Sequence, residues 1–359
     1  MFARKMGSGS ARMSLMGAFL WAVVATAARA GRAPLGIIEL LLLFATLVVV
    51  PLGLELARLV NSSQPGKLGR VARTLPPFAA VATVVSLWQP PGWVAAVLSL
   101  PWLLLGLLLA VAGIAPLFRR ANRSLENLAV GFAGIDLAIA GGWLVLSRAG
   151  LRPMGFQEPI VLLTAVHFHY IGFATAVIVA ITAYLFDRSG LRVALLQPLL
   201  WLVLLLPFAL ASGFVLSPLL RVVAAVALAA SVTALAGILF WFASHLHVQT
   251  ARVYLRLASA TAWIAMALAA VYAVSDHVGK PCLTMPAMAS THGILNALGF
   301  VLLSTLAFLV ELHTSGFEPE GTPRHAEKRA QGASEIPRKQ PTPVPDAIPD
   351  FVARDFYDR

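Results

Sequence analysis

Histidine and carboxylate residues lie inside stretches of this sequence that are otherwise almost wholly apolar. They are Glu39, Asp136, His167, His169, Asp276, His277 and His292. An ionisable side chain at the centre of a bilayer costs about 2.5–3.5 kcal/mol on insertion scales, so it should face a partner or a hydrated cavity. Imidazole and carboxylate groups also transfer protons near neutral pH. These residues are therefore the first candidates for catalysis or for a proton-coupled substrate site.

The segment from Thr164 to Phe173, Thr-Ala-Val-His-Phe-His-Tyr-Ile-Gly-Phe, holds two of these histidines. Residues i and i+2 of a helix differ by about 200°, so His167 and His169 point to opposite faces and cannot chelate one ion on a regular helix. We expect one histidine to line a cavity and the other to hold a neighbouring helix. The alternative is that both are packing residues.

A second segment contains Asp276-His277 and, after a short loop, Ser290-Thr291-His292-Gly293-Ile294-Leu295-Asn296-Ala297. His292 and Asn296 are four residues apart and share a helix face, with small residues beside them that allow close contact. Helix packing through an asparagine hydrogen bond is the alternative. The candidate catalytic residues are His167, His292, Glu39 and Asp136. The candidate substrate-binding residues are Thr164, His169, Tyr170, Asp276, His277 and Asn296.

The composition indicates which elements must position these residues. The chain has 359 residues, of which 59% are hydrophobic and 12% charged, and its mean hydropathy is +0.82. Soluble domains are about 25% charged. Because a helix needs about 20 apolar residues to cross a bilayer, the sequence predicts an all-α bundle of about ten spans. They lie near 13–29, 34–57, 74–89, 92–117, 126–147, 159–186, 193–216, 218–243, 253–275 and 289–313. The count becomes nine or eleven if the short span 74–89 or the tight turns at 89–92 and 217–218 are interpreted differently.

The net charge of +11 arises mostly from basic residues in alternate loops between the apolar runs. Such asymmetry predicts an inner (plasma) membrane protein with both termini in the cytoplasm. The charge is thus an orientation signal, and we expect a lipid bilayer as partner and no nucleic acid. In this orientation most of the candidate residues lie in the outer half of the membrane, with Asp136 near mid-depth. We therefore expect a single polar cavity that opens to the outside.

The two ends of the chain differ from the bundle predicted for 34–313. Residues 1–33 form an N-terminal helix or a signal-like segment, because a basic start and an apolar run precede Ala28-Arg29-Ala30. We favour a retained helix; cleavage would leave nine spans. Residues 314–359 are rich in proline and charge and predict a disordered cytoplasmic tail. The single cysteine, Cys282, excludes an internal disulfide. We expect no cofactor or metal, and the oligomeric state is open.

Three strings resemble the YndJ-like family of bacterial integral membrane proteins. They are Val49-Val50-Pro51-Leu52-Gly53-Leu54, His167-Phe168-His169-Tyr170-Ile171-Gly172-Phe173, and Thr291-His292-Gly293 followed by Asn296-Ala297-Leu298-Gly299-Phe300. The resemblance covers roughly residues 34–313. It implies a transporter-like membrane protein but no specific activity, so it adds no residue roles to those above.

Two functions compete, and we favour the first. The first is a small transporter or permease, proton-coupled through histidine, although residues 13–147 and 159–313 show no convincing internal similarity. The second is an intramembrane enzyme that isomerises, cyclises or opens an epoxide in a lipophilic substrate. In it, His167 and His292 act as acid and base, and Glu39 or Asp136 orients them. Metal or haem binding by histidines of different helices and a structural or assembly role are further alternatives.

Overall fold

The computed structural model describes residues 8–60, 74–118, 124–191 and 193–314. These residues form ten continuous helices, which confirms the all-α prediction. Eight of the helices in this part of the chain are long and apolar enough to cross a membrane. The other two are the shorter apolar helix α6 (Pro76–Trp88) and the N-terminal helix α2 (Ser8–Arg29). The predicted tail lies outside the described residues from 315 onward, as do residues 1–7.

The helices begin and end within a few residues of the predicted spans. After α2 and before α6 comes α3–η1–α4 (Ile37–Val60). The others are α7 (Trp93–Ile114), α8 (Leu125–Arg148), α9–η5–α10 (Ile160–Ser189), α11 (Leu196–Leu216), α12 (Pro218–Phe242), α13 (Gln249–His277) and α14–η7–η8–α15 (Met285–Thr314). Both predicted tight turns are present. Ser217 alone separates α11 from α12, where its Oγ accepts a hydrogen bond from the Leu220 N–H and Pro218 opens the helix.

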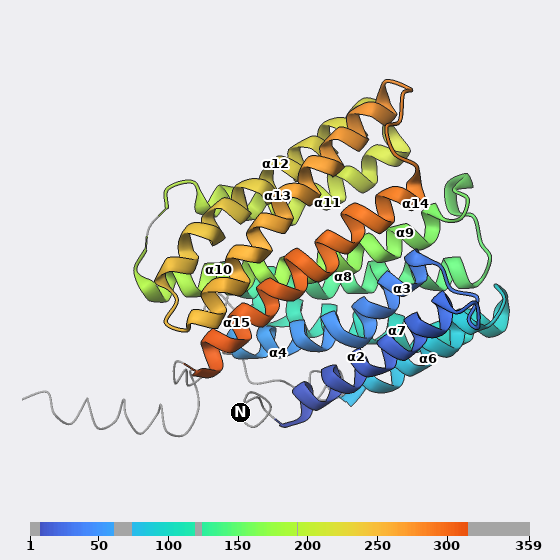
Figure 1. Cartoon of the computed structure of the whole chain (residues 1–359), viewed down its shortest axis with the longest axis horizontal. Helices are drawn as coiled ribbons and strands as arrows, with labels where there is room; N and C mark the ends of the chain where they lie inside the picture. The colour runs from blue at the N-terminus through green and yellow to red at the C-terminus, as the bar shows by residue number, and fades with distance from the viewer. Residues whose placement is uncertain (1–7, 61–73, 119–123, 192, 315–359) are drawn as a thin grey trace, which may run out of the picture. The chain divides into compact units, whose positions relative to one another are not determined.

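Three long helices, 37–60, 160–189 and 285–314, form the centre of the bundle and contact one another. Figure 1 shows α11, α12 and α13 on one side of them and α6 and α7 on the other. Each central helix contains a wider π-helical segment: η1 (Ala45–Val49), η5 (Phe168–Ala174), and η7 (Ala289–Gly293) with η8 (Leu295–Val301). Such segments frequently mark functional sites in helices.

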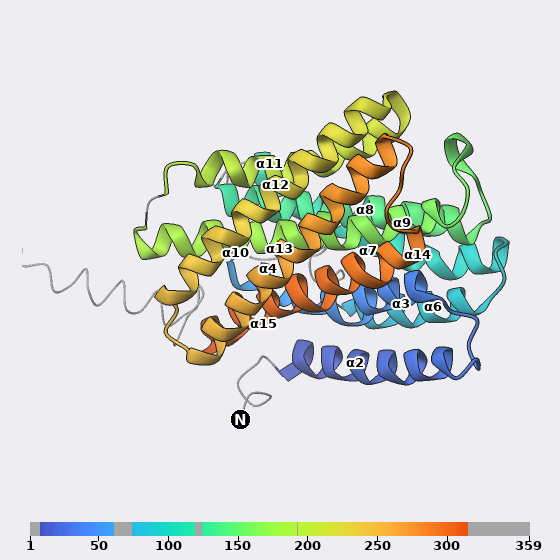
Figure 2. The ribbon, with the colours of Figure 1, turned by 45° about the horizontal axis from the view of Figure 1, so that its top comes forward.

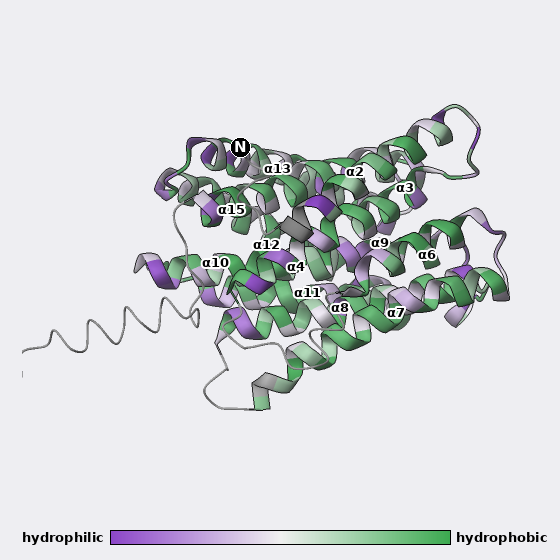
Figure 3. Ribbon diagram, turned by 90° about the horizontal axis from the view of Figure 1, so that it is seen from below, coloured by the Kyte–Doolittle hydropathy of each residue, from purple (hydrophilic) through white to green (hydrophobic). Residues whose placement is uncertain are grey.

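The outer helices present apolar side chains outward, and Figure 3 shows hydrophobic residues along most of their length. These surfaces imply association with a lipid bilayer. Helix α2 lies along the edge of the bundle in Figure 2 and packs on α3, η1 and α4. There Trp21 Nε1 donates a hydrogen bond to the Leu40 carbonyl at 2.8 Å, and its ring meets Phe44 edge-on.

Helices α7 and α8 pack closely through glycines of both helices. Gly106 and Gly113 lie on α7, and Gly134 and Gly141 lie on α8. A Cβ at Gly106 would come within 2.6 Å of the backbone of Ala138, and the other three sites would place it 2.7–2.9 Å from the facing helix. Because no side chain larger than hydrogen fits at these contacts, the two backbones meet directly.

A four-helix arrangement occurs twice in the chain. The first repeat is α6, α7, α8 and α9–α10, and the second is α11, α12, α13 and α14–α15. In both repeats the first two helices are joined by a tight turn and the fourth is a central helix. Near the start of that fourth helix, Thr164 donates to the Ile160 carbonyl and Thr291 donates to the Ala287 carbonyl, four residues back in each case.

The sequences of the two fourth helices match at the π-helical segments. Thr164, His169 and Gly172-Phe173 have the spacing of Thr291, Asn296 and Gly299-Phe300, and the seven-residue segments η5 and η8 begin four residues after each threonine. The glycines also pack alike. A Cβ at Gly172 would lie 2.7 Å from Asp136 Cβ of α8, and one at Gly299 would lie 2.5 Å from Thr261 Cβ of α13.

The two repeats run in the same direction through the bundle because each contains an even number of helices. Comparing residues 13–147 with 159–313 assumes five-span halves, which are out of step with a four-helix unit. That comparison therefore does not align the matching segments.

Candidate functional site

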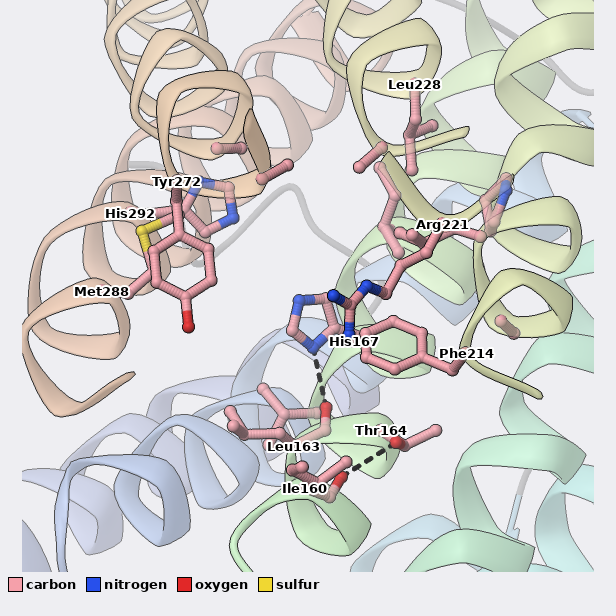
Figure 4. Close-up of a pocket in the computed structure, with 18 of the residues that line it drawn as sticks. Ile160, Leu163, Thr164, His167, Phe214, Arg221, Leu228, Tyr272, Met288 and His292 are labelled. Carbon is pink, nitrogen blue, oxygen red and sulfur yellow. Dashed lines mark hydrogen bonds between the residues drawn. The ribbon is translucent and has the colours of Figure 1, made fainter. Parts of the chain in front are cut away.

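A cavity of about 440 Å³ opens between the central helices and α11–α13, toward the end of the bundle where α11 meets α12. Its walls are mostly aliphatic and aromatic, and Figure 4 shows their convergence from both sides. The polar residues that line it are Thr164, His167, Tyr170, Arg221, Tyr272, Asp276, His292 and Asn296. Six of the ten residues selected from the sequence are therefore brought together here, and four lie elsewhere.

His167 and His292 project into this cavity from two central helices (Figure 4). Nδ1 of His167 lies 2.8 Å from the Leu163 carbonyl, and Nδ1 of His292 lies 2.8 Å from the Ala265 carbonyl. Because a carbonyl only accepts hydrogen bonds, each Nδ1 carries the hydrogen, and Nε2 of each neutral ring is left as an acceptor.

Arg221 and Asp276 form an ion pair that joins α12 to α13 at the cavity, with Nη2 3.0 Å from Oδ2. The guanidinium also lies 5.3 Å from the centre of the Phe214 ring. The two charged side chains are 33% and 41% exposed, so the pair contributes little to stability. The guanidinium of Arg221 instead places a positive charge beside the cavity wall near His167 (Figure 4).

Sequence reasoning missed Arg221 as a cavity residue, because it counted this arginine among the loop charges. One feature of the sequence could have indicated its role: Arg221 lies in the first turn of a predicted span, on the side of the membrane whose loops are poor in basic residues. Tyr272 was also missed. It lies one helical turn before Asp276 on α13, so the expected position of Asp276 at a cavity implied the same face for Tyr272.

Asn296 lies deeper in the cavity on η8 and is 8% exposed. Its Oδ1 has no hydrogen-bond partner within the described part of the chain. The neighbouring hydroxyl groups, in contrast, donate to the protein itself: Tyr170 to the Leu41 carbonyl at 2.8 Å and Thr164 to the Ile160 carbonyl at 2.9 Å. The bond from Tyr170 to Leu41 joins two of the central helices, 160–189 and 37–60. Asn296 thus has a buried amide oxygen that no described residue uses.

His169 lies outside the cavity, against α7. Its ring is fully buried, with Nδ1 donating to the Ala165 carbonyl at 2.7 Å and Nε2 accepting from Trp102 Nε1 at 2.7 Å. Both ring nitrogens are thus hydrogen-bonded within the protein, so neither is free to exchange a proton with a substrate. The structure places His167 at the cavity and His169 against a neighbouring helix.

The remaining three selected residues also lie away from the cavity lining. The Glu39 carboxylate accepts the Gly36 N–H at 3.0 Å, which stabilises the start of α3. Asp136 packs on Gly172, on the face of that helix that meets α8, and its Oδ1 has no partner among the residues described. His277 is exposed at the last turn of α13. The carboxylate that does line the cavity is Asp276, rather than Glu39 or Asp136 as expected for orienting the histidines.

Across residues 8–314, apart from the undescribed gaps, there is no group of three or more His, Cys, Asp or Glu residues that could hold an ion.

A second polar cluster lies at the opposite end of the central helices. Glu311 of α15 is 4% exposed, and its carboxylate accepts the backbone N–H groups of His247 and Val248 at 2.8 and 3.0 Å. Glu55, also buried, pairs with Arg58 one turn later at 2.6 Å, as its helical spacing suggests. Glu311 was not among the candidates from the sequence, although it is a carboxylate within a predicted span. These groups cap and join helices.

Comparison with known proteins agrees with the strings that carry the resemblance. A family model described as "YndJ-like protein" matches residues 40–300. The "Uncharacterized membrane protein YndJ" of Bacillus subtilis (strain 168) is 30% identical over 236 residues, which cover 66% of this chain and 41% of that protein. The chain thus spans less than half the length of this relative. No solved structure gives a significant match. Because the family model covers most of the bundle, including both histidine segments of the cavity, the chain belongs to the YndJ-like family of membrane proteins.

Proposed function

We propose that the chain binds a small lipophilic molecule in this cavity and that His167 and His292 transfer protons to and from it. The observation that supports this proposal is the pair of imidazole Nε2 atoms that face one mostly apolar cavity of about 440 Å³. Ligand pockets typically measure about 300–1,000 Å³ and combine apolar walls with a few placed polar groups.

The reaction we propose is an isomerisation, a cyclisation or an epoxide opening. One neutral imidazole accepts a proton from the bound molecule through Nε2, while the other, protonated, donates one to a second atom. Because both rings face one cavity, two charged imidazoles there would repel each other. Proton gain and loss balance in an isomerisation or cyclisation, so no co-reactant is needed; for an epoxide, water or a group of the substrate completes the opening.

The position of the cavity favours chemistry over alternating access. Its polar residues lie toward the α11–α12 end of the bundle, with Arg221 near the start of α12 and Asp276 near the end of α13. The basic loops predict that this end faces outward. A pocket that opens on one side suits a molecule that enters from the bilayer or the exterior.

Transport is the second candidate, and the duplicated four-helix arrangement supports it. Parallel repeats occur in several transporter folds, where substrate binds at the repeat interface. In this version the cavity histidines couple substrate movement to protons, and the molecule leaves chemically unchanged.

The test is untargeted lipid and metabolite profiling of cells and medium from a deletion strain. The strain is complemented with the wild type, His167→Gln, His292→Gln or His277→Gln, the last being a matched control at an exposed histidine outside the cavity. An enzyme predicts that one compound accumulates and another disappears in both cavity variants. A transporter predicts the same compounds redistributed between cells and medium. Full restoration of the profile by both cavity variants would refute the proposal.

A further inference from the structure

Arg221 extends a charged side chain toward the cavity. It lies in the first turn of α12, where a long basic side chain ordinarily reaches outward to the lipid headgroups. Figure 4 shows its guanidinium extending toward His167, and both residues line the cavity. The ring of Phe214, with its centre 5.3 Å from the guanidinium carbon, lies against it from α11. A charge that faces a cavity in a membrane protein usually marks a functional site.

Most of the hydrogen-bonding capacity of Arg221 is unused. A guanidinium has five N–H donors. Within the described chain, the guanidinium donates from Nη2 to Asp276 Oδ2 at 3.0 Å, and its other N–H groups have no partner there. The side chain is 33% exposed, so a ligand can approach it.

The lining beyond Arg221 is mostly apolar. Along α12 it continues from Arg221 through Leu228 to Ala229, and along α13 it continues from Asp276 back to Met266. At 1.5 Å per residue, these stretches extend about 12 Å and about 15 Å from the ion pair. The cavity therefore has a charged end and a long apolar interior, which is the pattern that an amphiphilic ligand requires.

The charges of the cavity favour an anion. Among the described lining residues, Arg221 and Asp276 carry the fixed charges, and these offset each other. The proposed reaction places a further proton on His167 or His292, which makes the site positive. A bound monoanion restores neutrality, whereas a dianion leaves an excess negative charge. A carboxylate also matches the planar fork of a guanidinium, with which it forms two parallel hydrogen bonds.

We infer that the cavity binds a lipophilic carboxylic acid as its carboxylate. The head group lies on the guanidinium of Arg221, and the apolar chain or ring system extends toward Met266 and Ala229. Asp276 competes with the head group for the same guanidinium and thereby limits the affinity for anions. The inference deepens the proposed function and rests on it, because it names the substrate class of the same cavity.

The test measures saturable binding of radiolabelled decanoate, and of its uncharged counterpart decanol, to the purified full-length protein in nanodiscs of zwitterionic lipid at pH 7. Equilibrium dialysis against empty nanodiscs subtracts partition into the lipid. Arg221→Gln should weaken decanoate binding about tenfold, as the loss of a charge-assisted hydrogen bond requires, and should leave decanol binding unchanged. Arg256→Gln is the matched control, because Arg256 is an exposed arginine of α13 that lies over the Phe240 ring and does not line the cavity.

Asp276→Asn separates ligand binding from a purely structural role of the ion pair. Arg221→Gln and Asp276→Asn both break the same contact between α12 and α13. If the pair only held these helices together, both variants would weaken binding alike. Because Asp276 competes with the ligand, Asp276→Asn should instead strengthen decanoate binding about two- to fivefold. Decyl phosphate, which carries nearly two negative charges at pH 7, should bind more weakly than decanoate.

Three results would overturn the inference: no saturable decanoate binding to the wild type, equal losses of decanoate and decanol in Arg221→Gln, or weaker decanoate binding in Asp276→Asn. Tighter binding of decyl phosphate than of decanoate would overturn the assignment of a carboxylate. Thermal unfolding verifies that each variant is folded, and if Arg221→Gln is not, the Asp276→Asn result still decides. Added to the His167→Gln/His292→Gln protein, Arg221→Gln should still weaken decanoate binding about tenfold. A failure of the proposed chemistry is thereby distinguished from a failure of this inference.

Discussion

Removing the hydrogen bond between Trp102 and His169 should destabilise the bundle without changing the cavity residues. The bond joins α7 to a central helix, and neither ring is exposed at all. Trp102→Phe keeps an aromatic ring but removes the donor, so His169 Nε2 is left buried and unpaired.

The size of the effect follows from these contacts. An unpaired buried acceptor costs about 1–3 kcal/mol, and the lost volume of the indole adds about 1 kcal/mol. We therefore expect Trp102→Phe to reduce the free energy of unfolding by about 2–4 kcal/mol. Trp201→Phe is the control for the lost volume, because Trp201 packs edge-on against Phe132 and makes no indole hydrogen bond to a described residue; it should cost about 1 kcal/mol.

The assay is reversible denaturant unfolding in detergent, followed by tryptophan fluorescence or circular dichroism, with His169→Leu and the double variant completing a cycle. Replacing both partners by apolar groups removes the unpaired atoms, so the double variant should cost at least 1 kcal/mol less than the sum of the single variants. Additive effects, or equal losses in Trp102→Phe and Trp201→Phe, would refute the reasoning.

Three other substitutions test the packing. Glu311→Ala should cost about 2–3 kcal/mol in the same unfolding assay, because two backbone N–H groups before α13 lose a charged acceptor; a loss below 0.5 kcal/mol would contradict this role. Gly172→Ala should cost about 1–3 kcal/mol, because its Cβ would lie 2.7 Å from Asp136, whereas Gly142→Ala, with open space around it, should stabilise α8 by up to about 1 kcal/mol. The opposite order would show that crowding does not govern these sites. Asp136→Asn keeps the shape of the side chain and removes a buried carboxylate whose Oδ1 has no partner among the described residues. The free energy of unfolding at pH 7 should stay equal or rise, and a clear decrease would reveal a charge partner.

Most of the helical fold follows from the sequence because apolar length and turn chemistry are local properties. The turn at 89–92 and the single-residue turn at Ser217 were both anticipated from proline and glycine. The four-helix repeat was not, since its signal is distributed over a few spaced residues, such as Thr164 and Thr291, that only the shared π-helical segments bring into register.

The cavity was predicted in part, for a physical reason. Spacing along one helix established that His167 and His169 diverge and that His292 and Asn296 share a face. It gave no information on which face of each helix meets another helix. Asp136 therefore was expected at the cavity, but it lies on the face of α8 that packs on Gly172. The contribution of α12 through Arg221 was likewise missed, because an arginine in the first turn of a span resembles the charges of the adjoining loop.

The close contact of α7 and α8 has a consequence for how the protein assembles. Its glycine contacts join helices that are neighbours along the chain, so this hairpin has little loop entropy to overcome and should form soon after both helices enter the membrane. The central helices instead bring together residues 37–60, 160–189 and 285–314, which are far apart in sequence. During synthesis the helix that carries His292 and Asn296 emerges last among the described helices. The cavity wall is consequently completed only when this helix enters the membrane, and a chain that ends before Met285 would keep its hairpins but lack the site.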